Sequence, residues 1–307
     1  MFFMAASIWR CTLNRAAAIL SLHRSLSLYN SSHGFHGEEI KRKLAQFSGG
    51  SVKLLKRENG IAELCIHNPV QMNAFSGTMI IALEEWISDL EKWEQGKGLI
   101  IYGSENTFSS GRDFNLAKIL ANPQDELKIW MLMQDILTRL QRLPIITVAL
   151  VEGKAEAEGA ELCVACDFRL MTEGSEIRFV HKHMELVPDW GGANRFTQLI
   201  ESRHALKLLS GAVRLHPELA LNIGLADEVL SCGADGALEE AQTWISSYTK
   251  GAAEVTRALK KLMVSGRELL MEDALRVEKD VLGSLWAGAA HLQALLEAKE
   301  THQRKHS

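Results

Sequence analysis

Three glutamates at short spacing, Glu156, Glu158 and Glu161, could carry acid–base chemistry. They follow an apolar, β-branched run, Ile145–Val151, that predicts a buried strand. After them, apolar residues return at helical spacing from Leu162. The stretch therefore predicts a strand, a tight turn and the start of a helix. Because the first N–H groups of a helix have no internal partner, such a turn suits a developing negative charge. The alternative is a solvated acidic loop.

Two histidines on either side of Lys182 are further candidates. Histidine can move a proton near neutral pH, which favours a role for His183, although His181 and His183 could equally be polar residues at a strand end. Cys163 and Cys166 have C-x-x-C spacing without a second pair or a nearby histidine. That spacing favours small core residues over a zinc site. No glycine-rich dinucleotide motif is present in the right context, so we predict no metal and no redox cofactor.

The composition excludes several classes of protein. The chain has 307 residues, of which 47% are hydrophobic and 23% charged, and its net charge is −4. These values are ordinary for a globular protein and give no general attraction to nucleic acid. No apolar run is long enough to span a membrane. The five scattered cysteines indicate a reducing compartment rather than a disulfide framework.

The first 36 residues have an unusual composition. They contain no acidic residue but include Arg10, Arg15 and Arg24 among serine, leucine and alanine. This is typical of an organellar transit peptide and would place the protein in the mitochondrial matrix. A disordered leader on a cytosolic protein is the alternative.

The remainder of the chain alternates predicted strands and helices. Strands are predicted at 52–54, 61–66, 98–102, 145–151, 168–171, 177–179 and 224–230. Helices are predicted at 38–47, 75–93, 130–143, 195–209 and 217–223, and from 236 onward. Asn59 and Gly60 predict a hairpin turn between the first two strands. We therefore predict an α/β fold with a leader (1–50), a core (51–235) and a C-terminal helical region (236–307).

Several stretches, in this order and at this spacing, resemble the crotonase (enoyl-CoA hydratase/isomerase) superfamily. They are Asn68–Phe75, Thr107–Asp113, Val148–Asp167, Pro188–Gly192 and Gly224–Val229. The resemblance implies a spiral of ββα units, with the C-terminal helices used in trimer assembly. It also implies an acyl-CoA thioester as substrate, no cofactor beyond the substrate's own coenzyme A, and a homotrimer or a dimer of trimers.

The resemblance further implies a set of site residues. Two backbone N–H groups would hold the thioester oxygen, and by position they belong to Ser110 and Glu158. Glu161 lies where the family places a catalytic glutamate, and His183 where hydratases carry a second one. The substrate-binding residues expected from the family are Phe108, Gly111, Asp113, Gly159 and Trp190.

Within this superfamily, the chain is most similar to the members that decarboxylate ethylmalonyl-CoA. The similarity includes Met72–Gly77, Ala165–Met171 and Ile177–Lys182. It implies decarboxylation of ethylmalonyl-CoA, with methylmalonyl-CoA as a second candidate substrate, as metabolite repair in the cytosol. Loss of CO2 leaves an enolate whose charge lies on the thioester oxygen, and an acid must then protonate the α-carbon. Glu161 is the first candidate for that acid.

The central turn departs from the family pattern. Glu158 stands in place of a glycine, which would strain the backbone if the position needs a positive φ. Its carboxylate also has the wrong sign beside an enolate. Lys154 replaces a large aromatic residue, and Glu185 and Asp189 replace small ones. Enoyl-CoA hydration and CoA binding without catalysis therefore remain alternatives.

Overall fold

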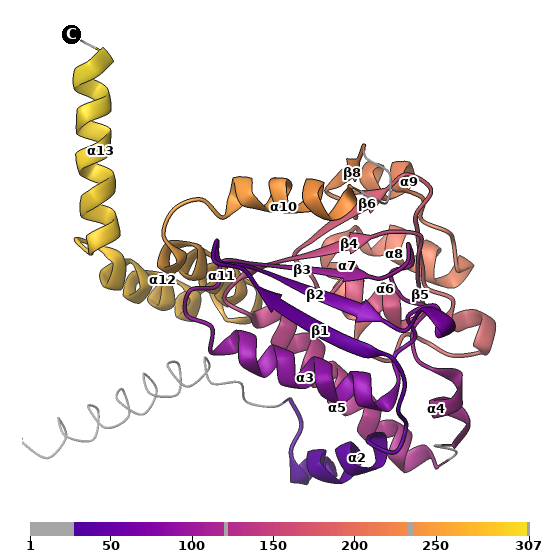
Figure 1. Ribbon diagram of the computed structural model, residues 1–307. Helices are drawn as coiled ribbons and strands as arrows, with labels where there is room; N and C mark the ends of the chain where they lie inside the picture. Colours follow the sequence, from indigo (N-terminus) through magenta and orange to yellow (C-terminus); the bar gives the residue numbers. More distant parts are fainter. Residues whose placement is uncertain (1–27, 120–121, 232–235, 306–307) are drawn as a thin grey trace, which may run out of the picture.

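The computed structural model describes residues 28–119, 122–231 and 236–305 (Figure 1). Residues 1–27 lie outside this part of the chain, so the transit-peptide interpretation of the leader stays a prediction. The described strands are β1 (Ser51–Lys56), β2 (Ile61–His67), β3 (Gly98–Gly103), β4 (Ile146–Val151), β5 (Lys154–Glu156), β6 (Phe168–Thr172), β7 (Glu176–Arg178) and β8 (Glu228–Leu230).

A six-stranded sheet forms the centre of the described structure, in the order β1-β2-β3-β4-β6-β8. β1 pairs antiparallel with β2, and all the other neighbouring strands in this sheet are parallel. The predicted hairpin is confirmed, and Gly60 in its turn has a φ of +82°, which glycine adopts readily. Because the parallel strands end at one edge of the sheet, the loops that follow them gather there.

Helices cover both faces of the sheet (Figure 1). Alternate residues of a strand point to opposite faces. In β3, Leu99 and Ile101 join the main core with α3 and α5, whereas Ile100 packs with Ile245 of α10. The described helical segments are η1 (Ser31–His33), α2 (Gly37–Leu44), η2 (Pro69–Gln71), α3 (Gly77–Glu91), α4 (Phe114–Ile119), α5 (Pro123–Arg142), α6 (Glu158–Cys163), η3 (His181–Met184), α7 (Gly192–Leu199), α8 (Ser202–Gly211), α9 (Pro217–Asn222), α10 (Ala237–Tyr248), α11 (Ala253–Glu268), α12 (Met271–Leu285) and α13 (Ala289–Lys305).

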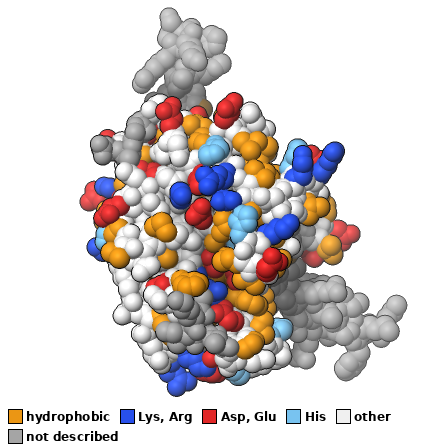
Figure 2. Space-filling view, turned by 90° about the vertical axis from the view of Figure 1, so that its right-hand side faces the viewer, with side chains coloured by type: hydrophobic (Ala, Val, Ile, Leu, Met, Phe, Trp, Pro, Cys, Tyr) orange, Lys and Arg blue, Asp and Glu red, His pale blue; other side chains and the backbone are white. Residues whose placement is uncertain are grey.

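A second, two-stranded sheet lies beyond the ends of the parallel strands. β5 pairs with β7, and Glu156 lies opposite Arg178. Glu156 therefore belongs to a strand and not to a solvated acidic loop. A bridge between Ser109 and Ala155 joins the loop after β3 to the same small sheet. Figure 2 views the molecule from this side, where charged and apolar side chains lie close together.

Two helices differ most from their predicted bounds. The helix predicted at 195–209 is two helices, α7 and α8, because the backbone is extended at Ile200. α5 begins seven residues before the predicted 130, since Asn122 caps its first turn and Pro123 fits the first helical position. None of the helices described is both long enough and apolar enough to span a membrane.

Candidate active site

The loop after β3 is held across the sheet edge by hydrogen bonds. The Ser109 N–H donates to the carbonyl of Lys154 (3.0 Å), and the Ser110 N–H donates to the carbonyl of Met72 (2.9 Å). The Ser110 amide is therefore used to fix the loop. This geometry corrects the prediction that Ser110 supplies an oxyanion donor, because its N–H already has an acceptor.

The amide of Arg112 instead faces the start of α6. Arg112 N–H donates to Oε2 of Glu158 (3.1 Å), and its guanidinium Nε lies 3.7 Å from Oε1 of the same carboxylate. Gly111 has a φ of +102°, and a Cβ there would collide with Glu158 Oε2 and come within 3.1 Å of the Glu158 nitrogen. The loop therefore approaches the start of α6 so closely that only glycine fits.

Glu158 is the first residue of α6, so its N–H has no partner within the helix. The predicted backbone strain lies one residue earlier. Ala157, the N-cap, has φ +48° and ψ −124°, a conformation that favours glycine. Gly159, predicted to bind substrate, instead packs against Ser109, because a Cβ there would collide with the Ser109 carbonyl oxygen.

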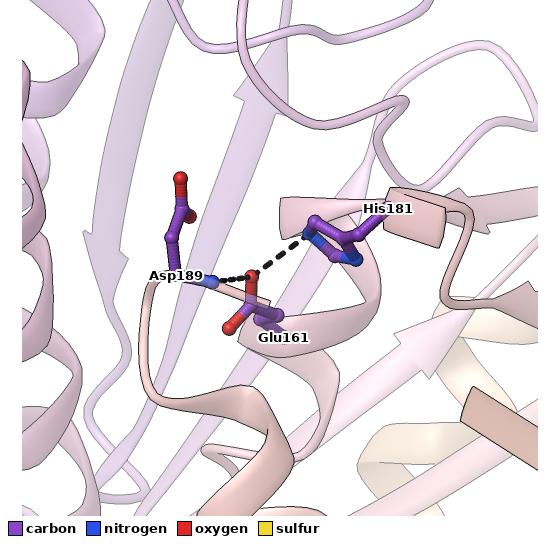
Figure 3. Close-up of side chains that lie close together, drawn as sticks. All are labelled: Glu161, His181 and Asp189. Atoms are coloured by element: carbon purple, nitrogen blue, oxygen red, sulfur yellow. Dashed lines mark hydrogen bonds and ion pairs between the residues drawn. The ribbon is translucent and has the colours of Figure 1, made fainter. Parts of the chain in front are cut away.

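Glu161 is completely buried at the centre of the site. Its carboxylate accepts the N–H groups of Asp189 (3.2 Å), Trp190 (3.0 Å) and Gly192 (2.6 Å). The His181 Nε2 lies 3.1 Å from its Oε1 (Figure 3). Glu161 therefore caps the start of α7 and fixes the position of the loop before that helix.

The two histidines of η3 have opposite environments. His183 is exposed, and its Nε2 lies 3.0 Å from the Arg178 guanidinium, so the structure does not bring it to Glu161. His181 is 3% exposed and contacts Glu161. Burial lowers the pKa of His181, but the carboxylates of Glu161, Glu158 and Asp189 together outweigh it and the pKa is raised overall. The structure therefore brings His181, and not the predicted His183, to Glu161.

Asp189 completes the cluster. Burial, together with the nearby carboxylates Glu158 and Glu161, raises its pKa to about 7, while Arg112 and His181 act in the opposite direction. Its Oδ1 is buried without a hydrogen-bond partner among the described residues. Figure 3 shows its side chain pointing away from the Glu161 carboxylate.

The other predicted site residues have structural contacts. Phe108 is fully buried in the main core, and Asp113 caps α4 by accepting the Asn115 N–H (2.8 Å). The buried ring of Trp190 packs edge-on against Phe75, with 5.8 Å between ring centroids. Substrate binding by these three residues stays a prediction.

The sequence pattern assigned no role to Arg112 and Asp189, and His181 was the less favoured of the two candidate histidines. The available signal was weak, since Asp189 stood out only as a departure from the family pattern. Polar ligand atoms of Glu161, His181 and Asp189 lie within 4.8 Å of one another. A metal ion there would have to displace the amides that already bind Glu161, so the absence of a metal stays our prediction.

The fold and the arrangement around Glu161 define a class of protein. The model of the enoyl-CoA hydratase/isomerase family matches residues 56–305, and the chain belongs to this family. Its relatives include two proteins named ethylmalonyl-CoA decarboxylase. The one from Xenopus tropicalis is 65% identical over 273 residues, which cover 89% of this chain and 91% of the relative. The one from Homo sapiens is 54% identical over 276 residues, covering 89% and 90%.

Solved structures share the fold at low sequence identity. An enoyl-CoA hydratase from Polaromonas sp. JS666 is 21% identical with a TM-score of 0.75, and the match covers 82% of this chain and 98% of that one. A putative enoyl-CoA hydratase from Thermobifida fusca, solved in complex with acetoacetyl-CoA, is 21% identical with a TM-score of 0.68, covering 80% and 96%. The predicted crotonase fold is confirmed.

Proposed function

We propose that this protein is an acyl-CoA decarboxylase that acts on ethylmalonyl-CoA, with methylmalonyl-CoA as a second substrate. The names of its relatives support this reaction. The observation that carries it is the contact between the Arg112 N–H and an anionic oxygen, Glu158 Oε2, beside the unpaired amide that begins α6. An enolate oxygen is an anion of the same kind.

The chemistry follows from this placement. The bond between the α-carbon and the substrate carboxylate breaks, CO2 leaves, and the electron pair becomes an enolate with its charge on the thioester oxygen. The N–H groups of Arg112 and Glu158 would stabilise that charge, and losing one such donor typically costs about 10²–10³ in rate. The reaction needs no cofactor besides the coenzyme A of the substrate.

The Glu158 side chain must move for the substrate to bind. Its carboxylate occupies the position proposed for the thioester oxygen, and it would repel the carboxylate of a malonyl-type thioester. A change of side-chain rotamer is sufficient, because the donor from this residue is its backbone N–H. We therefore expect turnover to be slower than in a homologue with glycine at this position.

The test is an assay of the purified protein against ethylmalonyl-CoA, methylmalonyl-CoA and crotonyl-CoA in parallel. We expect CO2 and butyryl-CoA from the first substrate and no hydration of the third, because the exposed His183 does not replace the second glutamate of hydratases. Failure to form butyryl-CoA even at high protein concentration would rule out the proposed reaction.

Two glycine variants test the oxyanion site directly. Gly111→Ala would bring a Cβ to 3.0 Å from the Ala157 Cβ and 3.1 Å from the Glu158 nitrogen, which would push the Arg112 amide away from the start of α6, so we expect at least a 100-fold loss of activity. Gly174→Ala is the matched control, because Gly174 also has a positive φ (+77°) but no atom lies within 4 Å of the place that a Cβ would take. Equal losses in both variants would mean that backbone strain alone explains the effect.

One observation favours a second function, CoA-thioester binding without turnover: the Glu158 carboxylate already occupies the donor position. In that case calorimetry would detect butyryl-CoA binding by a protein that forms no product. Glu158→Gly would then leave binding intact and bring about the decarboxylation that the wild type lacks.

We also propose a homotrimer, or a dimer of trimers, in the cytosol, where the enzyme would remove a wrongly formed acyl-CoA as metabolite repair. Exposed apolar side chains on α11, α12 and α13 support assembly through these helices. The acid-free leader supports the mitochondrial matrix as the alternative location. Tagging the full chain and a chain without residues 1–36 distinguishes the two compartments.

A further inference from the structure

The geometry around Glu161 argues against this residue as the proton donor. Each of its carboxylate oxygens accepts at least one backbone N–H, and the His181 ring lies against Oε1. A proton added to either oxygen would point at existing donors. Glu161 therefore serves as a fixed acceptor that shapes the loop before α7, and the α-carbon needs another acid.

Asp189 has the properties that Glu161 lacks. Its main chain is held on both sides, since its N–H donates to Glu161 and its carbonyl accepts from Gln134 Nε2 (2.7 Å). Its side-chain oxygen Oδ1 is buried without a partner among the described residues. The carboxyl is thus positioned by the backbone, while its side chain remains able to carry a proton.

The charged groups that face Asp189 come from three other segments. Glu158 and Glu161 lie on α6, Arg112 in the loop after β3, and His181 on η3. Glu158 and Arg112 are also the two residues whose amides would hold the thioester oxygen. Because the α-carbon is bonded to the thioester carbon, a substrate held there places its α-carbon in this same group of side chains.

We propose that Asp189 is the catalytic acid that protonates the α-carbon of the enolate, an inference that rests on the proposed decarboxylation. The Asp189 O–H bond breaks, its proton forms a new C–H bond at the α-carbon, and the enolate electron pair returns to restore the thioester carbonyl. Asp189 is left as a carboxylate. It takes a new proton from water, to which its partly exposed side chain has access. One CO2 leaves and one solvent proton enters per turnover.

The titration of Asp189 supports this role. Burial, Glu158 and Glu161 raise its pKa to about 7, so that a large fraction of the carboxyl is protonated near neutral pH. A neutral Asp189 also avoids repelling the substrate carboxylate. Decarboxylation should therefore decline as the pH rises above about 7, when Asp189 loses its proton.

The decisive variant is Asp189→Asn, which keeps the size of the side chain and both main-chain hydrogen bonds but cannot donate a carboxyl proton. Glu185→Gln is the matched control, because Glu185 is an exposed carboxylate at the end of η3. Asp189→Glu restores a carboxyl one methylene further out. Circular dichroism of all three variants checks that they fold.

Two readouts separate the proton donor from the decarboxylation. The first is butyryl-CoA formation from ethylmalonyl-CoA across about pH 5.5–8.5 (about 1.5 units either side of neutrality). The second is exchange of the α-hydrogen of butyryl-CoA in D2O, in which the Asp189 carboxylate removes the α-proton and returns a deuteron. This exchange is the reverse of the proposed protonation and needs no decarboxylation.

We expect Asp189→Asn to lose about 10²–10⁴-fold in both readouts, Glu185→Gln to match the wild type, and Asp189→Glu to recover part of the activity. If the wild type exchanges the α-hydrogen in an Asp189-dependent way but releases no CO2, the proposed decarboxylation is wrong, whereas the assignment of Asp189 as the proton donor is supported. The assignment of Asp189 as the proton donor is overturned if Asp189→Asn retains both activities, or if the wild type shows neither activity.

Discussion

At the scale of single residues, Glu158 and Asp189 determine how this member of the family differs from the pattern it resembles. Both introduce a carboxyl where the pattern has a small residue, and both interact with Arg112. Glu158 occupies the proposed donor site, whereas Asp189 adds a group that can hold a proton. The two substitutions therefore have opposite expected effects on activity.

Glu158→Gly is expected to increase kcat/KM for ethylmalonyl-CoA by about 10–100-fold. A hydrogen bond to a charged group contributes about 1.5–3 kcal/mol, and the substrate must displace this one from the Arg112 N–H. Glu158→Gln, which keeps the bulk but removes the charge, should give a smaller increase. Initial rates of butyryl-CoA formation measure both, and unchanged rates in Glu158→Gly would contradict a blocking role.

Asp189 should also affect stability in a pH-dependent way. Its pKa in the folded protein, about 7, lies above the ordinary value of 3.8, so the folded state binds the extra proton. The resulting stabilisation is complete below about pH 4 and is lost as the pH rises to about 7. Relative to Asp189→Asn, the wild type should lose on the order of 2–4 kcal/mol across this range. Urea unfolding of both proteins at several pH values measures the difference in their free energies of unfolding. A difference that does not change with pH would mean that the carboxyl is solvated and contradict the prediction.

At the scale of elements, the segment from β5 into α6 brings the site together. β5 is paired with β7, and the Ala157 N–H donates to the carbonyl of Arg178 (3.0 Å). α6 begins at the next residue. The chain has a single residue in which to turn from strand to helix, and this explains the positive φ of Ala157.

Ala157→Gly is therefore expected to stabilise the protein by about 1 kcal/mol. Relief of the strained backbone, worth about 1–3 kcal/mol, should exceed the entropic disadvantage of glycine, which is about 0.5–1 kcal/mol. Ala160→Gly, three residues further into α6, is the control and should destabilise by about 1 kcal/mol or more. Denaturant midpoints compare the two, and a loss of stability in Ala157→Gly would show that the conformation is not strained.

At the scale of the whole molecule, a buried ion pair connects the C-terminal helices to the core. Lys260 of α11 is 6% exposed and binds the Asp167 carboxylate. Asp167 also accepts the N–H and the hydroxyl of Thr147 on β4, at 2.8 and 2.9 Å. Burial lowers the pKa of Lys260, and the Asp167 carboxylate opposes that shift. This contact positions α11 against the central sheet.

Lys260→Met should cost about 3–5 kcal/mol, because it leaves the Asp167 carboxylate without its cation. Lys279→Met is the control, since Lys279 is exposed on α12 and its pair with Asp280 should contribute little. Guanidinium unfolding measures both variants. A cost below about 1 kcal/mol for Lys260→Met would mean that the pair does not secure the helix.

The C-terminal helices also expose an apolar surface that should assemble. A groove of about 670 Å³ is lined by side chains that include Leu282, Leu285 and Trp286, and Trp286 is 68% exposed. We expect sedimentation analysis to show a trimer or hexamer, and Leu282→Asp combined with Trp286→Asp to yield smaller species. A wild-type monomer at micromolar concentration would contradict the proposed assembly.

Much of the fold could be predicted because local patterns determine it. Asn59 and Gly60 indicated the hairpin, and the unbroken apolar run Leu99–Ile101 fits a strand that is buried on both faces. The break at Ile200 was missed, because the apolar spacing continues across it. β5 was missed because its three residues pair with distant segments, with β7 twenty-two residues later in the chain and with Ser109.

The sequence by itself determined the order of the elements, the family and the place of the glutamate at 161 near the start of a helix, since periodicity and motifs are properties of neighbouring residues. Tertiary structure alone decided which donors and acids are available. The Ser110 amide donates to the Met72 carbonyl, whereas the Arg112 amide faces the Glu158 side chain; Glu161 faces His181, not His183; and Asp189 lies among charges from three other segments. These outcomes depend on contacts between residues distant in sequence, which no local pattern records.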